Sequence, residues 1–139
     1  MKISDIRKIK IEHEGKSLDL LSEDDHFLRR FGSLEMLKIT GGEESEFVLR
    51  KEADDLIFPI SGQVSITVKD RRDASPSQGA QEKIELGPES GFGLLIPFNL
   101  AYSISSDGAA SLIRLSTHKF SSKRGDQTIS IKDFESYHA

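Results

Sequence analysis

Residues 55–70 read DLIFPISGQVSITVKD and carry the clearest structural signal in the chain. An apolar run ends at Ser61 and Gly62, and from 64 to 69 apolar and polar residues alternate. Alternation with a period of two is typical of a strand with one wet face, and glycine between two strands indicates a tight turn. The stretch therefore predicts two successive strands, with Pro59 marking a sheet edge or a bend.

Short strands separated by glycine and proline turns are predicted along the rest of the chain as well. An Asp-Gly pair at 107–108 between two such segments is a strong hairpin signal, and the polar stretch 71–81 predicts a flexible hairpin loop. The other segments are KIKIEHEGKSLDLL (8–21), SLEMLKIT (33–40), EFVLRKEA (46–53), EKIEL (82–86), FGLLIPF (92–98), AYSISS (101–106), AASLIRLST (109–117) and TISI (128–131). About nine strands and no clear helix predict an all-β antiparallel sandwich or barrel, and the pattern leaves jelly roll and immunoglobulin-like sandwich open.

Length and composition narrow the possible functions. We expect a single domain over 1–139, since 139 residues can bury one core. The formal charge of −4 gives no case for nucleic acid or an anionic membrane, and no apolar run approaches the ~20 residues of a membrane span. The first residues lack an apolar signal core and the chain has no cysteine, so we expect a cytoplasmic protein without disulfides or thiolate metal sites.

Three stretches resemble the sugar-nucleotide cupins, the ketoisomerases of dTDP-4-keto-6-deoxyglucose and the related dTDP-4-dehydrorhamnose 3,5-epimerases. They are GGEESEFVLRKEADDLIFPISGQVSITV (41–68), ELGPESGFGLLIPFNLAYSISS (85–106) and SLIRLSTHKFSSKRGDQTISIKDFESY (111–137). The resemblance spans nearly the whole chain, and its most specific parts are the Ser-Gly turn and the Gly-Leu-Leu-Ile-Pro segment. It implies a jelly-roll β-barrel, a homodimer and a sugar nucleotide bound in the barrel mouth.

The family's two active-site histidines fall on Val48 and Arg50 when counted back from the Ser-Gly turn. Valine can neither donate nor accept a proton, and arginine stays protonated, so neither supplies the general base that the chemistry requires. The metal-binding histidine of other cupins is likewise replaced, by Ala101 or Tyr102. A single carboxylate such as Asp54 does not make a transition-metal site, so we expect no metal and no cofactor.

Several residues remain candidates for the site. Arg50 is predicted to face the interior, where Asp54, Asp55 or Glu35 could pair with it or an anionic ligand could bind it. Arg29 and Arg30 could hold nucleotide phosphates, as a basic residue near this place does in the family, or form a solvated charge pair. Tyr102 could stack on a sugar or act as an acid, and His118 could replace the lost histidines. We therefore predict Tyr102 and His118 as catalytic candidates and list the ligand-binding candidates as Arg29, Arg30, Arg50, Asp55 and Tyr102.

Three functions are compatible with this pattern. The favoured one is a metal-free cupin that binds a small anionic or sugar ligand without histidine-based catalysis. The second is an active isomerase or epimerase of a nucleotide-linked keto sugar that uses non-histidine acid and base residues. The third is a structural or interaction cupin dimer whose pocket is filled by Phe92, Phe98 and Tyr102. Whether the chain is an enzyme is left open at this stage.

Overall fold

The computed structural model describes residues 2–3, 5–22, 28–42 and 46–135. Short strands account for most of the regular structure, as expected. The strands are β1 (Arg7–Lys10), β2 (Glu12–Glu14), β3 (Ser17–Asp19), β4 (Ser33–Ile39), β5 (Phe47–Leu49), β6 (Asp55–Ser61), β7 (Val64–Lys69), β8 (Gln81–Leu86), β9 (Phe92–Ile96), β10 (Ala101–Ser105), β11 (Ala110–Ser116) and β12 (Gln127–Ile129), and the helical segments are a 3₁₀ turn (Ser122–Arg124) and α1 (Ile131–Phe134).

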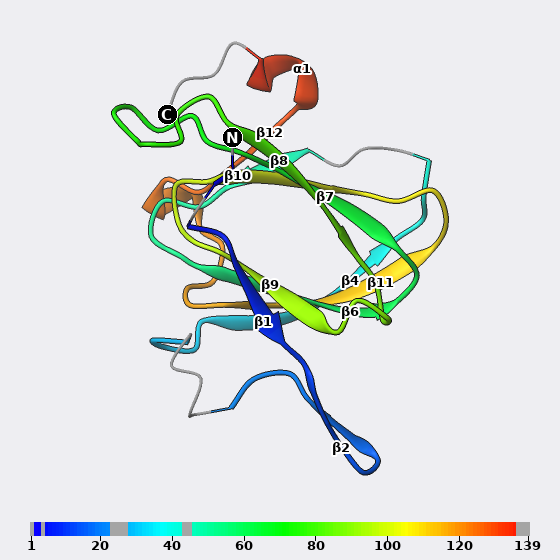
Figure 1. The fold of residues 1–139 in the computed structure, drawn as a ribbon. Helices are drawn as coiled ribbons and strands as arrows, with labels where there is room; N and C mark the ends of the chain where they lie inside the picture. Colours follow the sequence, from blue (N-terminus) through cyan, green and yellow to red (C-terminus); the bar gives the residue numbers. More distant parts are fainter. Residues whose placement is uncertain (1, 4, 23–27, 43–45, 136–139) are drawn as a thin grey trace.

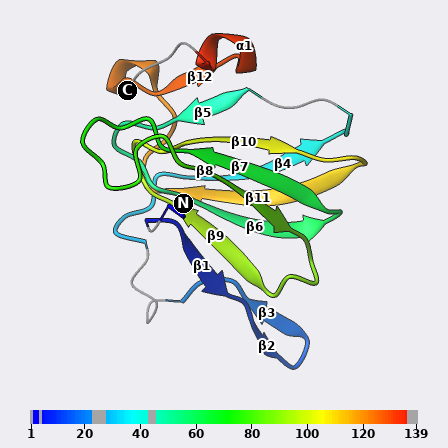
Figure 2. The same ribbon diagram turned by 45° about the horizontal axis from the view of Figure 1, so that its top comes forward.

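Two five-stranded antiparallel sheets face each other and form the body of the protein (Figure 1). The first sheet has the order β1-β9-β6-β11-β4 and the second has the order β12-β5-β10-β7-β8. The small hairpin of β2 and β3 projects from this body, beyond the end of β1 (Figure 2). The prediction of an all-β antiparallel fold is therefore confirmed, and within the two large sheets only β7 and β8 are neighbours both in sequence and in the sheet.

The β6–β7 turn has the geometry that its sequence predicts. Gly62 has a φ of 76°, and a Cβ atom there would lie 2.4 Å from the carbonyl oxygen of Ala109, so a side chain would clash with the neighbouring turn. Pro59 lies at a register shift between β6 and β11, beyond the last residue of β6 that pairs with β9. Proline has no N–H to donate to the ladder, so it is tolerated at such an irregularity. The irregularity in β6 therefore occurs at the proline from which a bend or an edge was predicted.

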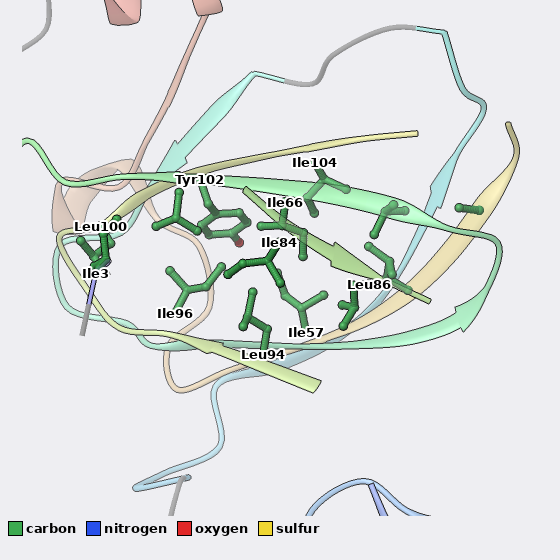
Figure 3. Close-up of a cluster of buried hydrophobic side chains, with 14 of the residues drawn as sticks. Ile3, Ile57, Ile66, Ile84, Leu86, Leu94, Ile96, Leu100, Tyr102 and Ile104 are labelled. Atoms are coloured by element: carbon green, nitrogen blue, oxygen red, sulfur yellow. The ribbon is translucent and has the colours of Figure 1, made fainter. Parts of the chain in front are cut away.

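The main hydrophobic core fills the space between the two sheets (Figure 3). Val64, Ile66 and Val68 of β7 face inward, as their alternation predicts, and are at most 1% exposed. They meet the inward residues of the opposite sheet, of which Ile57, Leu94 and Ile96 are labelled in Figure 3. Sheet-on-sheet packing of this kind keeps the outer faces free for other roles.

The two outer faces differ in what covers them. Phe134 of α1 stacks on Phe47 with ring centroids 4.3 Å apart and covers one end of the second sheet. The first sheet carries an apolar cluster on its outer face, made of Ile9, Ile11, Leu56, Phe58 and Leu95 with partly buried neighbours. At its margin Leu34 and Met36 of β4 are 62% and 61% exposed.

The loop at 71–81 is tied to a single carboxylate. Asp70 is buried and accepts hydrogen bonds from the backbone and guanidinium of Arg72 and from the hydroxyl groups of Ser75 and Ser77. Burial alone would raise the pKa of Asp70, but the hydrogen bonds from Arg72, Ser77 and Ser75 hold it well below its usual value. The flexibility expected of this loop stays a prediction.

Candidate functional site

A buried ion network surrounds Arg50, the first residue after β5. The Arg50 carbonyl accepts the backbone N–H of Asn99 at 2.7 Å, and the side chain, 3% exposed, lies between the sheets. Its Nη1 donates to Oδ1 of Asp55 at 2.7 Å, its Nη2 donates to the carbonyl of His118, and its Nε lies 3.3 Å from Oδ2 of Asp126. Two buried carboxylates therefore neutralise this guanidinium from within the protein.

Asp55, at the start of β6, connects Arg50 to a tyrosine. Besides Arg50, its carboxylate accepts the hydroxyl groups of Ser116 at 2.7 Å and of Tyr102 at 2.5 Å. Burial and the negative charge of Asp55 raise the pKa of the Tyr102 hydroxyl well above its ordinary value, although Arg114 opposes this shift. Tyr102 therefore keeps its proton, which is directed at Asp55.

Arg114 completes the chain of contacts on the other side of Tyr102. Its Nη1 donates to the Tyr102 hydroxyl at 3.2 Å, while Nε and Nη2 form a bidentate pair with Glu35 at 3.1 Å each. Arg114 and Glu35 are directly paired residues of β11 and β4, so their side chains leave the sheet on the same face. The network thus runs from Asp126, through Arg50, Asp55 and Tyr102, to the rim of the sandwich.

A cavity of about 360 Å³ opens between the two sheets next to this network. Strands β4 and β11 form one wall, and β5, β10 and β12 form the other. Its lining includes Lys38, Glu46, Val48, Tyr102, Arg114 and Thr128. Figure 3 shows the Tyr102 side chain pointing from β10 into the space between the sheets, whereas Arg50 and Asp55 are not part of the cavity wall.

Val48, which the resemblance predicts to fall on one of the two family histidine positions, lines this cavity between two polar neighbours. It is directly paired with Tyr102 of β10 on one side and with Thr128 of β12 on the other. Directly paired residues project to the same face of a sheet, so the three side chains share one wall. Val48 therefore forms an aliphatic part of the cavity wall.

His118 lies beyond the end of β11 and is not among the residues that line the cavity. Its Nδ1 is buried, with no hydrogen-bond partner in the described part of the chain. Burial and the positive charges of Arg30 and Arg124 lower the pKa of His118. The structure therefore does not bring together the two catalytic candidates, Tyr102 and His118, at the cavity. His26 and His138 lie outside the described residues.

The two arginines proposed for phosphate binding lie just before β4. Nη2 of Arg29 donates to Oδ2 of Asp54 at 3.1 Å, and the Arg29 side chain is 62% exposed. Oδ1 of Asp54 accepts the backbone N–H of Phe98 at 3.1 Å. Arg30 is exposed, and neither arginine lines the cavity. Asp54, one of the partners considered for Arg50, therefore pairs with Arg29 instead.

Two important members of the network were missed from the sequence. Arg114 carries a signal that could have found it, because in the strand SLIRLST it lies two residues from Leu112 and from Ser116 and shares their inward face. Asp126 carries no such signal, since it follows a 3₁₀ turn that only the tertiary structure places beside Arg50. No group of three potential metal ligands occurs among the residues that the structure describes.

The two facing antiparallel sheets give the chain a fold that is similar to that of solved cupin-fold epimerases. The chain is similar to dTDP-6-deoxy-D-glucose-3,5-epimerase of Legionella pneumophila, in complex with dTDP-4-keto-L-rhamnose, with a TM-score of 0.80 and 16% identity over 97% of this chain and 78% of that one. It is similar to a mutant of ChmJ, a 3'-monoepimerase of Streptomyces bikiniensis in complex with dTDP, with a TM-score of 0.82 and 14% identity over 97% and 74%.

A dTDP sugar isomerase of Desulfovibrio desulfuricans gives a TM-score of 0.74 and 20% identity over 89% of this chain and 80% of that one. At these identities the likeness establishes the fold, and the expected resemblance to sugar-nucleotide cupins is confirmed at that level. No protein-family model and no curated protein matches the sequence. Among the described residues, no helix is long and apolar enough to cross a membrane.

Proposed function

We propose that this protein is a metal-free cupin of the sugar-nucleotide lineage that binds a small anionic or sugar ligand in the cavity beside Tyr102, without histidine-based catalysis. The observation that carries the proposal is that Arg50 is buried and paired with two carboxylates of the protein. It stands at a family histidine position, yet it is sequestered by Asp55 and Asp126 outside the cavity wall. A cation held in this way is a structural element, since it can neither exchange a proton nor reach a ligand.

The cavity itself supports a binding role. Its volume of about 360 Å³ lies within the range of small-molecule sites. It combines apolar surface from Val48 and Tyr102 with the guanidinium group of Arg114 and the hydroxyl group of Thr128. An open cavity with converging polar groups favours a ligand-binding protein over a structural or interaction protein whose pocket is filled by its own side chains. Phe98, one of the residues expected to fill it, is 43% exposed and lies elsewhere.

The side chains argue against proton transfer at the cavity. No histidine occurs among the described residues that line it. The Tyr102 hydroxyl donates to Asp55 and accepts from Arg114, so its hydrogen-bonding capacity is already used within the protein. An acid for an epimerase must present its proton to the substrate. The isomerase reading remains the alternative, and the experiment below tests it.

The proposal includes a homodimer. β1 is an edge strand of the first sheet, and an unpaired edge is a liability that proteins usually cover. The outer face of the same sheet carries the apolar cluster around Phe58, with Leu34 and Met36 exposed beside it. Leu34 and Met36 lie on β4, the other edge strand of this sheet, and exposed apolar surface beside an open strand edge is typical of an interface between subunits.

The test is a binding panel of dTDP-, UDP- and GDP-linked sugars followed by thermal shift. A ligand at a hundredfold its dissociation constant stabilises the folded state by ~2.7 kcal/mol. Thr128→Trp fills the cavity from the exposed edge strand β12, and we expect it to abolish the shift. Gln127→Trp, at the neighbouring exposed position that lies outside the cavity lining, is the matched control and should retain it.

Catalysis is tested with the same protein by following deuterium incorporation from solvent into dTDP-4-keto-6-deoxyglucose by proton NMR. We expect no exchange above the rate without protein. Exchange that depends on Tyr102 would establish the isomerase alternative and overturn the proposal. Stoichiometric transition metal in the purified protein, together with loss of binding on chelation, would overturn its metal-free part.

A further inference from the structure

Arg114 and Tyr102 are the members of the network that line the cavity, and Glu35 is the partner that Arg114 holds beside it. Arg114 lines the cavity, and its Nε and Nη2 face the two carboxylate oxygens of Glu35 at 3.1 Å each. This is the fork geometry in which guanidinium and carboxylate fit best. The cavity therefore contains a bidentate carboxylate-binding group whose present occupant is a side chain of the protein.

The two partners of this pair are unequally held. The Arg114 side chain is 14% exposed, whereas that of Glu35 is 42% exposed. Burial alone would lower the pKa of Arg114, but the neighbouring Tyr102, Glu35 and Asp55 outweigh burial and raise it, so the guanidinium stays charged. A buried cation needs an anion beside it, while a half-exposed carboxylate can return to water at much lower cost.

The position of Glu35 makes its departure possible. β4 is an edge strand, paired only with β11 in the first sheet. No hydrogen bond holds Glu35 other than those from Arg114 in the described part of the chain. Arg114, in contrast, is also fixed through Nη1 to the Tyr102 hydroxyl, which is anchored on Asp55. The guanidinium is thus preorganised, and the carboxylate opposite it is replaceable.

We propose that the ligand of this cavity carries a carboxylate, which displaces Glu35 and takes over its bidentate pairing with Arg114. This inference rests on the proposed ligand-binding function and names the ligand class as a small sugar acid, of which a hexuronate is the type. A neutral sugar has no group that can replace Glu35 on the guanidinium, so the internal pair disfavours it. Glu35 then acts as a specificity-determining residue, because only an anion of matching geometry competes with it.

The cavity size agrees with this class. At about 360 Å³ it is near the lower end of small-molecule sites, which suits one sugar ring better than a complete nucleotide sugar. Thr128 adds a hydroxyl-bearing side chain to the residues that line it, on the same face of the sheet as Val48. A nucleotide attached to the sugar would extend out of the cavity mouth.

The inference is tested by isothermal titration calorimetry with two matched pairs of probes, glucose with glucuronate and UDP-glucose with UDP-glucuronate. Within each pair, only one probe carries a carboxylate. Comparing one pair with the other shows whether a free or a nucleotide-linked acid is preferred. We expect the acid of at least one pair to bind the wild-type protein more tightly than its neutral partner. Glu35→Gln removes the competing charge and should tighten acid binding about tenfold, since a charged hydrogen-bonded pair is lost from the free state.

Variants of Arg114 complete the test. Arg114→Lys keeps the charge but loses the fork, and we expect it to weaken acid binding about tenfold with little effect on the neutral probe. Arg114→Met should abolish the preference for the acid. If Arg114→Met does not fold, the weaker acid binding of Arg114→Lys provides the test. Glu85→Gln makes the same charge change on β8, away from the cavity, and should leave every affinity unchanged.

Three results would overturn the inference, and each is distinguishable from failure of the proposed function. If acid and neutral probes bind equally and Glu35→Gln does not change this, the ligand does not exchange with Glu35. The proposed ligand-binding function would still stand. Acid binding that is insensitive to Arg114→Lys would likewise overturn the inference and leave that function standing. Failure of all four probes to bind both the wild-type protein and Glu35→Gln would overturn the carboxylate inference, and failure of the sugar-nucleotide panel as well would overturn the proposed function.

Discussion

Arg50 and Asp55 form a buried ion pair, with 2.7 Å between Nη1 and Oδ1 and side chains that are 3% and 0% exposed. That Arg50 falls on a histidine position of the resembled enzymes stays a prediction. The pair itself gives Arg50 an internal charge balance, and an arginine held in this way does not act as a titratable base. Of the two roles considered for Arg50, ion pairing describes its contacts.

We expect Arg50→Ala to lower the free energy of unfolding by about 3–5 kcal/mol, because it leaves two carboxylates, Asp55 and Asp126, buried without their cation. Urea denaturation followed by circular dichroism measures this loss. Arg124→Ala removes an exposed cation nearby and is the control, with an expected change of about 0.5 kcal/mol or less. A loss below about 1 kcal/mol for Arg50→Ala would show that the network does not hold the fold together.

The Tyr102 hydroxyl should resist ionisation in alkaline solution. Its pKa is raised well above the ordinary value of 10.0 by burial and by Asp55. Since the folded state favours the neutral phenol, this stabilisation is complete below about pH 10 and is lost as the pH rises toward the folded pKa. The chain has two tyrosines and no tryptophan, so Tyr137→Phe leaves Tyr102 as the sole chromophore for tyrosinate absorbance near 295 nm.

In that variant we expect no tyrosinate signal near pH 10 while the protein is folded, and a signal that appears together with unfolding at higher pH. Urea-unfolded protein at the same pH is the control and should titrate near 10. A folded-state transition near pH 10 would contradict the buried contact between Tyr102 and Asp55.

Asp70 should make stability dependent on acid pH. Its pKa is lowered by hydrogen bonds that outweigh burial, so the charged carboxylate stabilises the folded state above its ordinary pKa of 3.8. This contribution is lost as the pH falls below that value. We expect Asp70→Asn to cost about 1–3 kcal/mol at pH 7, with the difference from wild type shrinking by pH 3. Asp73→Asn, at an exposed position in the same loop, should have no comparable effect.

The homodimer predicts a mass in light scattering of twice the 15.5 kDa of one chain at micromolar concentration. Charges placed on the apolar outer face, in the double variant Leu34→Glu and Met36→Glu, should shift the mass to that of the monomer because they oppose burial of this face. Lys83→Glu on the second sheet is the control and should remain dimeric. A monomeric wild-type protein at that concentration would refute this part of the proposal.

Much of the fold follows from local signals. The alternation from Val64 to Val68 specifies which side chains enter the core, and Gly62 permits a turn with a positive φ that other residues resist. The N-terminal segment is a partial exception. Ile9 and Ile11 alternate with polar residues and are buried, but against the outer face of the first sheet, and Leu18 is 55% exposed on the projecting hairpin. Alternation identifies a buried face without saying which layer buries it.

The sequence by itself determined the strand pattern and the need of a buried Arg50 for an acidic partner. Only the tertiary structure decided that the partners are Asp55 and Asp126, and that Arg114, rather than Arg50, faces the cavity. The reason is physical. Strand periodicity is set by the local backbone, whereas an ion pair between residues 76 positions apart depends on how distant segments pack.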